Sequence, residues 1–221
     1  MYENRNKMNI HELRKLFFRQ GIFSVAMIRK EFPKFHSENI YRWQEKGYIH
    51  KIRNGWYFFD EVKGFPGLND LIANLVYEPS YIGHQHALNF YELIPEAIVW
   101  NISMTTKKTY SFIKPFGRFQ YYSLRDDLFF GFHEKEINFN GMMRKIRYSD
   151  LEKAILDVLY HFDFYEETIQ EMEELRFDDE TMRDDVDWGK LYNYLERYKN
   201  KTLERKIDIL RNIHLPIRKG A

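Results

Sequence analysis

The fold of this chain is decided by residues 24–59, which read SVAMIRKEFPKFHSENIYRWQEKGYIHKIRNGWYFF. Ser24 can cap a helix whose apolar residues recur at helical spacing, and Pro33 ends that helix. The apolar spacing predicts another helix over residues 37–46. Gly47 then supplies the left-handed conformation that turns the chain out of this helix.

Two short strands are expected after Gly47, over residues 48–53 and 55–59. They are closed by Asn54-Gly55, the preferred pair for a tight hairpin turn. Two isoleucines of the first strand lie three residues apart, which breaks the alternation of a regular strand. The sequence therefore predicts a β-bulge in this hairpin.

A further helix is predicted before residue 24. Asn9 can cap it, Glu12 stands where a capping-box carboxylate reaches back, and Gly21 ends it. Three helices followed by a hairpin are typical of a winged helix-turn-helix, which places its third helix in the DNA major groove. We therefore expect a DNA-binding domain over residues 1–62.

Eight polar residues of the third helix and the hairpin are candidates for contacting DNA. Arg and Asn can read guanine and adenine edges, whereas Ser, Tyr and Lys suit phosphates. Glu38 and Glu45 oppose phosphate contact, so only part of the helix can face DNA. Any solvated helix surface has such residues, so the prediction rests on the order of the elements. The candidates are Ser37, Asn39, Tyr41, Arg42, Lys46, Lys51, Arg53 and Asn54.

Charge is distributed unevenly along the 221 residues, although the net charge is only +1. Residues 1–60 contain twelve Lys and Arg against six Asp and Glu, a net charge of +6. Residues 61–221 contain 22 basic and 27 acidic residues, a net charge of −5. A basic N-terminal part followed by an acidic remainder is typical of a DNA-binding module with a separate effector domain.

A second domain is expected over residues 68–221, after a Gly- and Pro-containing linker at residues 61–68. The pattern predicts an α+β fold with a mainly antiparallel sheet, a second Asn-Gly hairpin at residues 140–141, and charged C-terminal helices over residues 166–213. Ser149 is the expected cap of a long helix over residues 150–162. The other expected helices are 70–77 and 82–90, and the strands are 99–105, 118–123, 128–132, 136–138 and 142–148.

We find no catalytic constellation in the sequence and expect neither an enzyme, nor a metal site, nor a cofactor. The chain has no cysteine, Gly-rich phosphate loop, nucleophile elbow or HExxH motif. His84 and His86 are two residues apart, so a helix points them in different directions. Residues 163–187 contain twelve acidic side chains, but they lack the EF-hand order, so a solvated surface or a contact for a basic partner is favoured.

A cytoplasmic location without membrane insertion is expected. No apolar run approaches the roughly 18 residues of a membrane span, and the polar N-terminus has no signal-peptide core.

Three segments carry a resemblance to a known family. They are KGYIHKIRNGWYFF at residues 46–59, EPSYIGHQHALNFYELIPE at residues 78–96 and YSDLEKAILDVLY at residues 148–160. In their order and spacing they resemble the AbiEi antitoxins of type IV toxin–antitoxin (abortive infection) systems, over about residues 10–160. The chain departs from the family pattern at Gln85, His86, Asn89 and Glu92, where family members often carry Ser, Tyr or a small residue.

The resemblance implies a sequence-specific transcriptional repressor that binds inverted repeats of double-stranded DNA in its own promoter. It also implies that the second domain neutralises a cognate nucleotidyltransferase-like toxin, without requiring stable direct contact. Under this resemblance Glu152, Lys153 and Asp157 are structural determinants. The same residues are also compatible with an ordinary helix that has Glu152 and Lys153 at its surface.

Two other functions stay open from the sequence. The first is a protein-interaction module whose winged helix no longer reads DNA and whose contact surface is residues 163–187. The second is a metal-dependent nuclease or a regulator of a transferase that uses the same acidic stretch.

Overall fold

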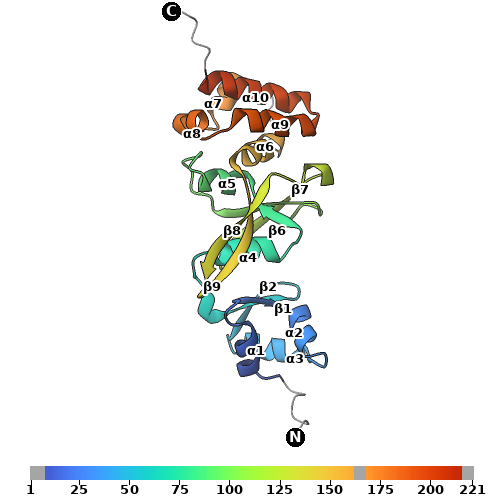
Figure 1. Ribbon diagram of the computed structural model, residues 1–221. Coiled ribbons are helices and arrows are strands. Elements are labelled where there is room, and N and C mark those ends of the chain that lie inside the picture. The colour runs from blue at the N-terminus through green and yellow to red at the C-terminus, as the bar shows by residue number, and fades with distance from the viewer. Residues whose placement is uncertain (1–7, 162–167, 216–221) are drawn as a thin grey trace, which may run out of the picture. The chain divides into compact units, whose positions relative to one another are not determined.

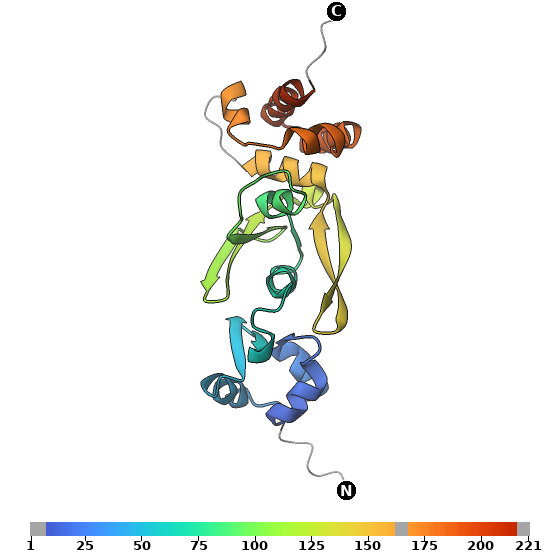
Figure 2. The same ribbon diagram turned by 90° about the vertical axis from the view of Figure 1, so that its left-hand side faces the viewer.

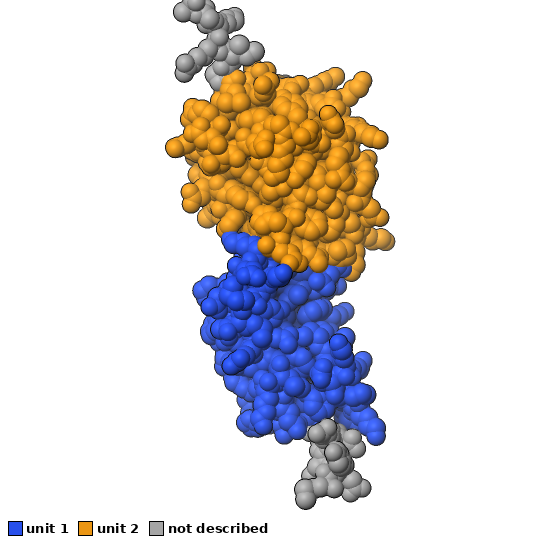
Figure 3. Space-filling view, viewed as in Figure 1, with its two compact units in different colours: residues 1–78, 114–116, 135–146 blue, residues 79–113, 117–134, 147–221 orange. Residues whose placement is uncertain are grey.

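The chain forms two units, each assembled from stretches that are separate in the sequence (Figure 3). The structure is a computed structural model that describes residues 8–161 and 168–215. Unit 1 contains Met1–Glu78, Lys114–Phe116 and Lys135–Ile146. Unit 2 contains Pro79–Ile113, Gly117–Glu134 and Arg147–Ala221.

Unit 1 begins with three helices and a three-stranded antiparallel sheet (Figure 1). The three helices and the hairpin occur where the sequence predicts them, whereas the short strand β1 was not expected. The sheet has the strand order β1-β3-β2. The elements are α1 (Ile10–Phe17), β1 (Ile22–Ser24), α2 (Val25–Glu31), α3 (Glu38–Glu45), β2 (Ile49–Arg53) and β3 (Trp56–Phe59).

Local side-chain capping explains where the first two helices begin. Asn9 and Glu12 form the predicted capping box, in which each side chain accepts a hydrogen bond from the other residue's backbone N–H. Ser24 accepts from the N–H of Met27 and caps α2, as expected. Ser37 occupies the N-cap position of α3 without a capping hydrogen bond from its side chain.

The β2–β3 hairpin is held against the rest of its sheet along the whole of β3. The predicted bulge is present, because the register shifts between Lys51 and Arg53. β1 pairs with β3 up to its first residue, Trp56, and the N–H of Val25 donates to the carbonyl of Gly55 at 2.8 Å. The turn of the hairpin is therefore tied to the start of α2.

The expected linker at residues 61–68 lies inside unit 1, which continues to Glu78. It contains the end of the 3₁₀ helix η1 (Asp60–Val62) and leads into α4 (Leu68–Leu75). Val62 is fully buried in this unit. The division between units thus falls later in the chain than the predicted boundary.

A distant hairpin completes unit 1 at the end of α1. The amide of Asn140 donates to the carbonyl of Phe18 at 2.6 Å, and Arg144 donates to the carbonyl of Gln20 at 3.2 Å. The ring of Phe139 lies against Gly21, which has φ +70°. The carbonyl of Phe18 also accepts from the N–H of Gly21 at 3.0 Å, so the hairpin adds a second hydrogen bond to the turn that follows α1.

A mixed six-stranded sheet, with the order β6-β7-β5-β4-β9-β8, lies mostly in unit 2. β4 pairs antiparallel with β5, whereas β5 with β7 and β4 with β9 are parallel pairs, so this sheet is less antiparallel than expected. Its strands are β4 (Ser80–Ile82), β5 (Trp100–Thr105), β6 (Tyr110–Lys114), β7 (Gly117–Ser123), β8 (Phe132–Phe139) and β9 (Met142–Ser149).

Several predicted strand positions need correction. β6 was not expected, and the strand predicted over residues 128–132 is wrong, because η2 (Asp126–Leu128) occupies its start and β8 begins only at Phe132. Ile82 ends β4 and does not begin a helix. The predicted Asn140-Gly141 hairpin is confirmed, with φ angles of 52° and 71° at the two residues.

Helices cover the unit 2 sheet in layers. Figure 2 shows α6 crossing between the sheet and the C-terminal helices α9 and α10, and α6 contacts α5, α9 and α10. The C-terminal region is helical as expected, although residues 166–167 lie outside the described residues. The helices are α5 (His84–Phe90), α6 (Leu151–His161), α7 (Ile169–Glu173), α8 (Asp179–Asp184), α9 (Trp188–Tyr198) and α10 (Lys201–His214).

The cap of α6 is Asp150, so the prediction of Ser149 is wrong. The N–H of Lys153 donates to Oδ1 of Asp150 at 2.9 Å. Ser149 is the buried last residue of β9. Because α6 begins at Leu151, the capping position falls one residue after Ser149. Phe162, the predicted end of this helix, lies outside the described residues.

We predict that Gly21→Ala destabilises the protein more than Gly47→Ala. Both glycines have φ +70°, so each alanine carries the penalty of a left-handed residue, roughly 1–2 kcal/mol. At Gly21 the added Cβ also overlaps Cε1 of Phe139, whereas at Gly47 nothing lies within 4 Å. The overpacking adds about 1–3 kcal/mol, measurable by urea unfolding. Equal destabilisation of the two variants would contradict the docking of the hairpin on Gly21.

Candidate nucleic-acid interface

α3 is anchored to unit 1 by one apolar side. Ile40 and Trp43 are buried, and the ring of Phe35 stacks on Trp43 with 5.9 Å between the ring centroids. Tyr41 lies on a different side of the helix and is 64% exposed. The packing of Ile40 and Trp43 therefore decides which polar residues of α3 reach the surface.

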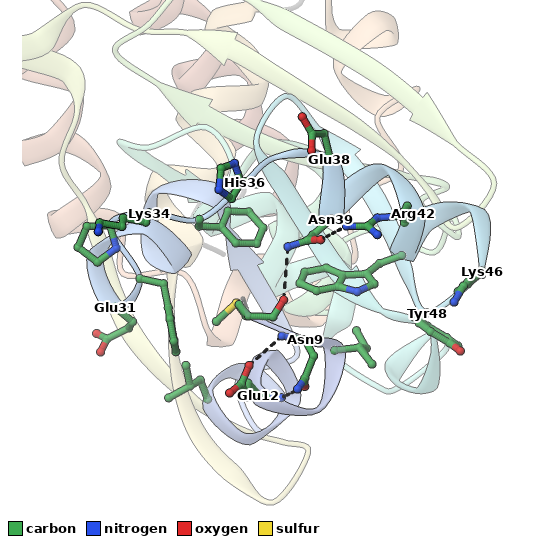
Figure 4. Close-up of a pocket in the computed structure, with 17 residues that line it drawn as sticks. Asn9, Glu12, Glu31, Lys34, His36, Glu38, Asn39, Arg42, Lys46 and Tyr48 are labelled. Carbon is green, nitrogen blue, oxygen red and sulfur yellow. Dashed lines mark hydrogen bonds between the residues drawn. The ribbon is translucent and has the colours of Figure 1, made fainter. Parts of the chain in front are cut away.

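A groove runs along α3 and has a cavity volume of about 1180 Å³ (Figure 4). Its walls come from the first turn of α1, the α2–α3 turn and α3 itself. Four basic side chains, counting histidine, line it, namely Lys34, His36, Arg42 and Lys46. Glu12, Glu31 and Glu38 also line it, so the groove is polar and of mixed charge.

The predicted DNA-contacting residues of α3 fall on two sides of the helix. Asn39, Arg42 and Lys46 line the groove, as their spacing along the helix requires. Tyr41 does not line it and interacts with Glu45, whose hydrogen bond and charge raise the pKa of the tyrosine. Ser37 accepts a hydrogen bond from Arg29 of α2 at 3.1 Å. The structure thus brings three of these residues together and leaves two apart.

Asn39 links α3 to the residues before α1. Its amide nitrogen donates to the carbonyl of Met8 at 3.3 Å, and its Oδ1 accepts from the guanidinium of Arg42 (Figure 4). Asn39 is half-buried, whereas Arg42 is exposed. The carboxamide therefore holds the guanidinium on the groove side of α3.

The hairpin residues differ in how available they are. Lys51 and Asn54 are exposed. Arg53 is half-buried, donates to the carbonyl of Val76 at 3.1 Å and places its guanidinium 4.9 Å from the centre of the Tyr77 ring. The structure therefore gives Arg53 an intramolecular role at the end of α4, which the hairpin sequence does not indicate.

Sequence reasoning missed the basic residues that precede α3. Arg29 lies on α2, and Lys34 and His36 lie in the α2–α3 turn. All three are exposed, and the last two line the groove. For Lys34 and His36 the available signal was their position between two short helices, because the expected helix-turn-helix would bring this turn close to the start of its next helix.

Unit 2 contains a buried polar cluster centred on α6. Lys153 and Asp157 form an ion pair, and both side chains are 0% exposed. The hydroxyl of Tyr81 donates to Oδ2 of Asp157 at 2.9 Å, and Nζ of Lys153 donates to the hydroxyl of Tyr198 at 2.7 Å. The alternative with Lys153 at the helix surface is therefore wrong.

Burial governs the titration of this cluster. It lowers the pKa of Lys153 and raises the pKa of Asp157, while the attraction between the two charges opposes both shifts. Burial also raises the pKa of Tyr81 and of Tyr198 well above the ordinary value, and the charge of Asp157 adds to it. Both hydroxyls therefore stay protonated and available as donors at neutral pH.

A second ionic group fastens α6 to α9. Nζ of Lys190 lies 2.8 Å from Glu152 and 3.1 Å from Asp150. Burial alone would lower the pKa of Lys190, but its hydrogen bonds and ion pairs with these two carboxylates outweigh this effect and raise it. Glu152 is also buried, so the alternative that placed it at the surface is wrong.

His84 is the first residue of α5 and adopts a left-handed conformation, with φ 58°. It is buried, and its ring stacks on Tyr122 with 5.0 Å between centroids. Burial, together with the charge of His161, lowers the pKa of His84 to about 3. His84 is therefore neutral in the folded protein at physiological pH.

Neither a set of protein-family models nor a search of curated protein sequences gave a match to this chain. Among residues 8–161 and 168–215, no group of three or more His, Asp and Glu side chains could hold a metal ion. In the same residues, no helix combines the length and apolarity needed to cross a membrane.

We predict that Lys153→Met lowers the free energy of unfolding by about 3–5 kcal/mol, because it leaves the carboxylate of Asp157 buried without its ion-pair partner. The double variant Lys153→Met, Asp157→Asn removes both charges and keeps an oxygen that accepts from the buried tyrosine hydroxyls, so it should recover part of this stability in urea unfolding. The matched surface control is Arg183→Ala, which breaks an exposed pair with Asp184 and should change stability by less than about 0.5 kcal/mol. A double variant as unstable as Lys153→Met would contradict the ion-pair explanation.

We predict that His84 makes the protein less stable in mild acid. Its folded pKa of about 3 lies below the ordinary value of 6.5, so between these values the unfolded chain binds a proton that the folded protein does not. Above about pH 6.5 the neutral His84 does not reduce the free energy of unfolding. As the pH falls toward 3, the free energy of unfolding decreases, with a limiting slope of about 1.4 kcal/mol per pH unit.

The matched variant is His84→Asn, because Asn tolerates the left-handed conformation and cannot be protonated in this range. Urea unfolding of both proteins from pH 6 to pH 4.5 measures the difference in slope. Parallel stability curves would show that His84 does not cause the acid sensitivity.

Proposed function

We propose that this protein is a sequence-specific DNA-binding transcriptional repressor that contacts DNA through the groove side of α3. The observation that carries the proposal is the grouping of Arg42 and Lys46 with Lys34 and His36 along one groove. The groove belongs to a unit with the element order α1-β1-α2-α3-β2-β3 and the sheet order β1-β3-β2. Three helices followed by a hairpin in this order support the proposed winged helix-turn-helix.

Charge supports the N-terminal part of unit 1 as the part that binds DNA, although three glutamates at the groove oppose its three lysine and arginine side chains. Lysine and arginine side chains bind DNA by releasing the cations condensed around phosphates, so affinity falls steeply with salt. Arg42 and Lys46 are exposed and stand at the groove, as do Lys34 and His36. The net charge of +6 over residues 1–60 acts in the same direction.

The interface that one copy can offer is small. Glu38 opposes phosphates at the groove itself, Glu45 does so on the rest of α3, and Arg53 is held by Val76. Lys51 and Asn54 are the exposed predicted residues of the hairpin. Because a single module of this size gives limited specificity, we propose that two copies bind an inverted repeat in the protein's own promoter.

The antitoxin part of the proposal rests on the resemblance to the AbiEi antitoxins. Unit 2 contains two of the three resembling segments, residues 78–96 for the most part and residues 148–160. In this proposal unit 2 neutralises a nucleotidyltransferase-like toxin in the cytoplasm, and unit 1 represses the operon that encodes both proteins. No catalytic step and no cofactor is required of this chain.

A second candidate function is a protein-interaction module. It is favoured by the exposed stripe of Glu38, Tyr41 and Glu45, which suits a basic protein surface better than DNA. The intramolecular hydrogen bond of Arg53 points the same way, because it withdraws one predicted DNA contact.

A salt titration of DNA binding distinguishes the two functions. The probes are the duplex immediately upstream of the gene and a scrambled duplex of equal length. We expect tighter binding to the upstream duplex, and Lys46→Ala should reduce the slope of log affinity against log salt by about 1, because one phosphate is no longer neutralised. The matched control is Lys63→Ala, which removes an exposed lysine outside the groove and should leave the slope unchanged.

Equal affinity for the two duplexes would contradict the repressor and favour the interaction module. Coexpression with the neighbouring gene then tests the antitoxin part separately: if the neighbour inhibits growth, this protein should relieve the inhibition.

A further inference from the structure

The hydrogen bonds of Asn39 restrict which residue of α3 can read a base. Asparagine recognises adenine by donating from its amide nitrogen to N7 and accepting at its oxygen from N6. Here the nitrogen donates to the carbonyl of Met8 at 3.3 Å, and the oxygen accepts from Arg42. Each of these atoms therefore keeps only one further N–H or lone pair for adenine, and the two intramolecular hydrogen bonds fix the orientation of the carboxamide.

Arg42 is in the opposite situation. α3 contains one basic residue, Arg42, and two acidic residues, Glu38 and Glu45. The hydrogen bond to Asn39 uses one of the five N–H donors of the guanidinium, and the side chain is exposed. An arginine with two further donors can bind O6 and N7 of guanine together, which is the commonest specific contact to a base in the major groove.

Asn39 is well placed to restrict the motion of Arg42. The two residues are three apart on one side of α3, and Met8 is buried at 5% exposure. Two hydrogen bonds in series, from Arg42 to Asn39 and from Asn39 to the backbone carbonyl of the buried Met8, thus hold the guanidinium in place. Ordering a long side chain in advance removes the entropy that binding would otherwise cost.

We propose that Asn39 is a positioning residue and not a base-reading residue, and that it presents Arg42 to a guanine in the operator. This inference rests on the proposed DNA-binding function and assigns the specificity of α3 to one guanidinium. Lys46, the remaining predicted residue that lines the groove, then contributes a contact that is independent of base identity.

The test is selection of binding sites from a library of random duplexes with the full chain, followed by affinity measurements on single-base variants of the selected site. We expect the selected site to contain a guanine whose replacement weakens binding by about 5- to 150-fold, the range for a bidentate base contact. Arg42→Ala should lose this discrimination at that one position and keep it elsewhere.

The Asn39 variants separate positioning from base reading. Asn39→Ala should weaken the preference at the same guanine by about threefold to tenfold, the effect of releasing one long side chain. Asn39→Asp keeps an oxygen that accepts from Arg42 but cannot donate to Met8, so it should retain most of the preference while its added charge lowers affinity for every duplex. Lys63→Ala is the control that should leave the selected site unchanged.

Two results would overturn the inference while leaving the proposed repressor intact. In the first, Asn39→Ala keeps the full preference at the guanine that Arg42→Ala loses. In the second, Asn39→Ala loses discrimination at an adenine instead. A wild-type protein that selects no site at all would contradict the proposed function itself.

Discussion

The buried ion pair of Lys153 and Asp157 is the constraint around which unit 2 is organised. A charge taken out of water is costly unless every neighbour compensates it, so the elements around α6 must supply polar partners at fixed positions. β4 supplies Tyr81 and α9 supplies Tyr198, one from each layer that covers α6. The pair therefore constrains how the sheet, α6 and the C-terminal helices fit together, because its charges and the two tyrosine hydroxyls satisfy one another only in this arrangement.

Unit 1 follows a different strategy, in which apolar packing sets the orientation of a polar surface. Ile40 and Trp43 fix the rotation of α3, and this rotation puts Arg42 on the groove and Tyr41 on a different side. Ion pairs in this unit lie at its surface, such as Arg14 with Glu61, and such pairs contribute little free energy. The specificity of the candidate interface is thus built from hydrogen bonds on an apolar support, whereas that of unit 2 is built inside the core.

Structural features that depend on neighbouring residues could be predicted from the sequence, whereas features that depend on distant residues could not. The capping box of Asn9, the cap at Ser24 and the Asn140-Gly141 turn are local, and all three are present. The short segments β1 and β6 form strands because each pairs with a neighbouring strand. Their own sequences do not have the alternation of apolar and polar residues that predicts a strand. The sequence left open a surface position for Lys153, because charged side chains are usually exposed. Only the folded chain shows that Tyr198, far along the sequence, lies next to it. At the candidate interface, the residues of α3 followed from helical spacing, whereas the engagement of Arg53 by Val76 and of Asn39 by Met8 required the folded chain.

The assembly of unit 1 from distant stretches of the chain also limits when this unit can finish folding during synthesis. Its contacts at Phe18, Gln20 and Gly21 are supplied by Phe139, Asn140 and Arg144, which are translated much later. During synthesis the N-terminal helices emerge from the ribosome well before the residues that complete their packing. The nascent unit must therefore wait in an unfinished state, with the end of α1 uncovered, until the hairpin has left the exit tunnel. A chain that ends between Glu78 and Lys135 would have a first unit without the hairpin that completes it.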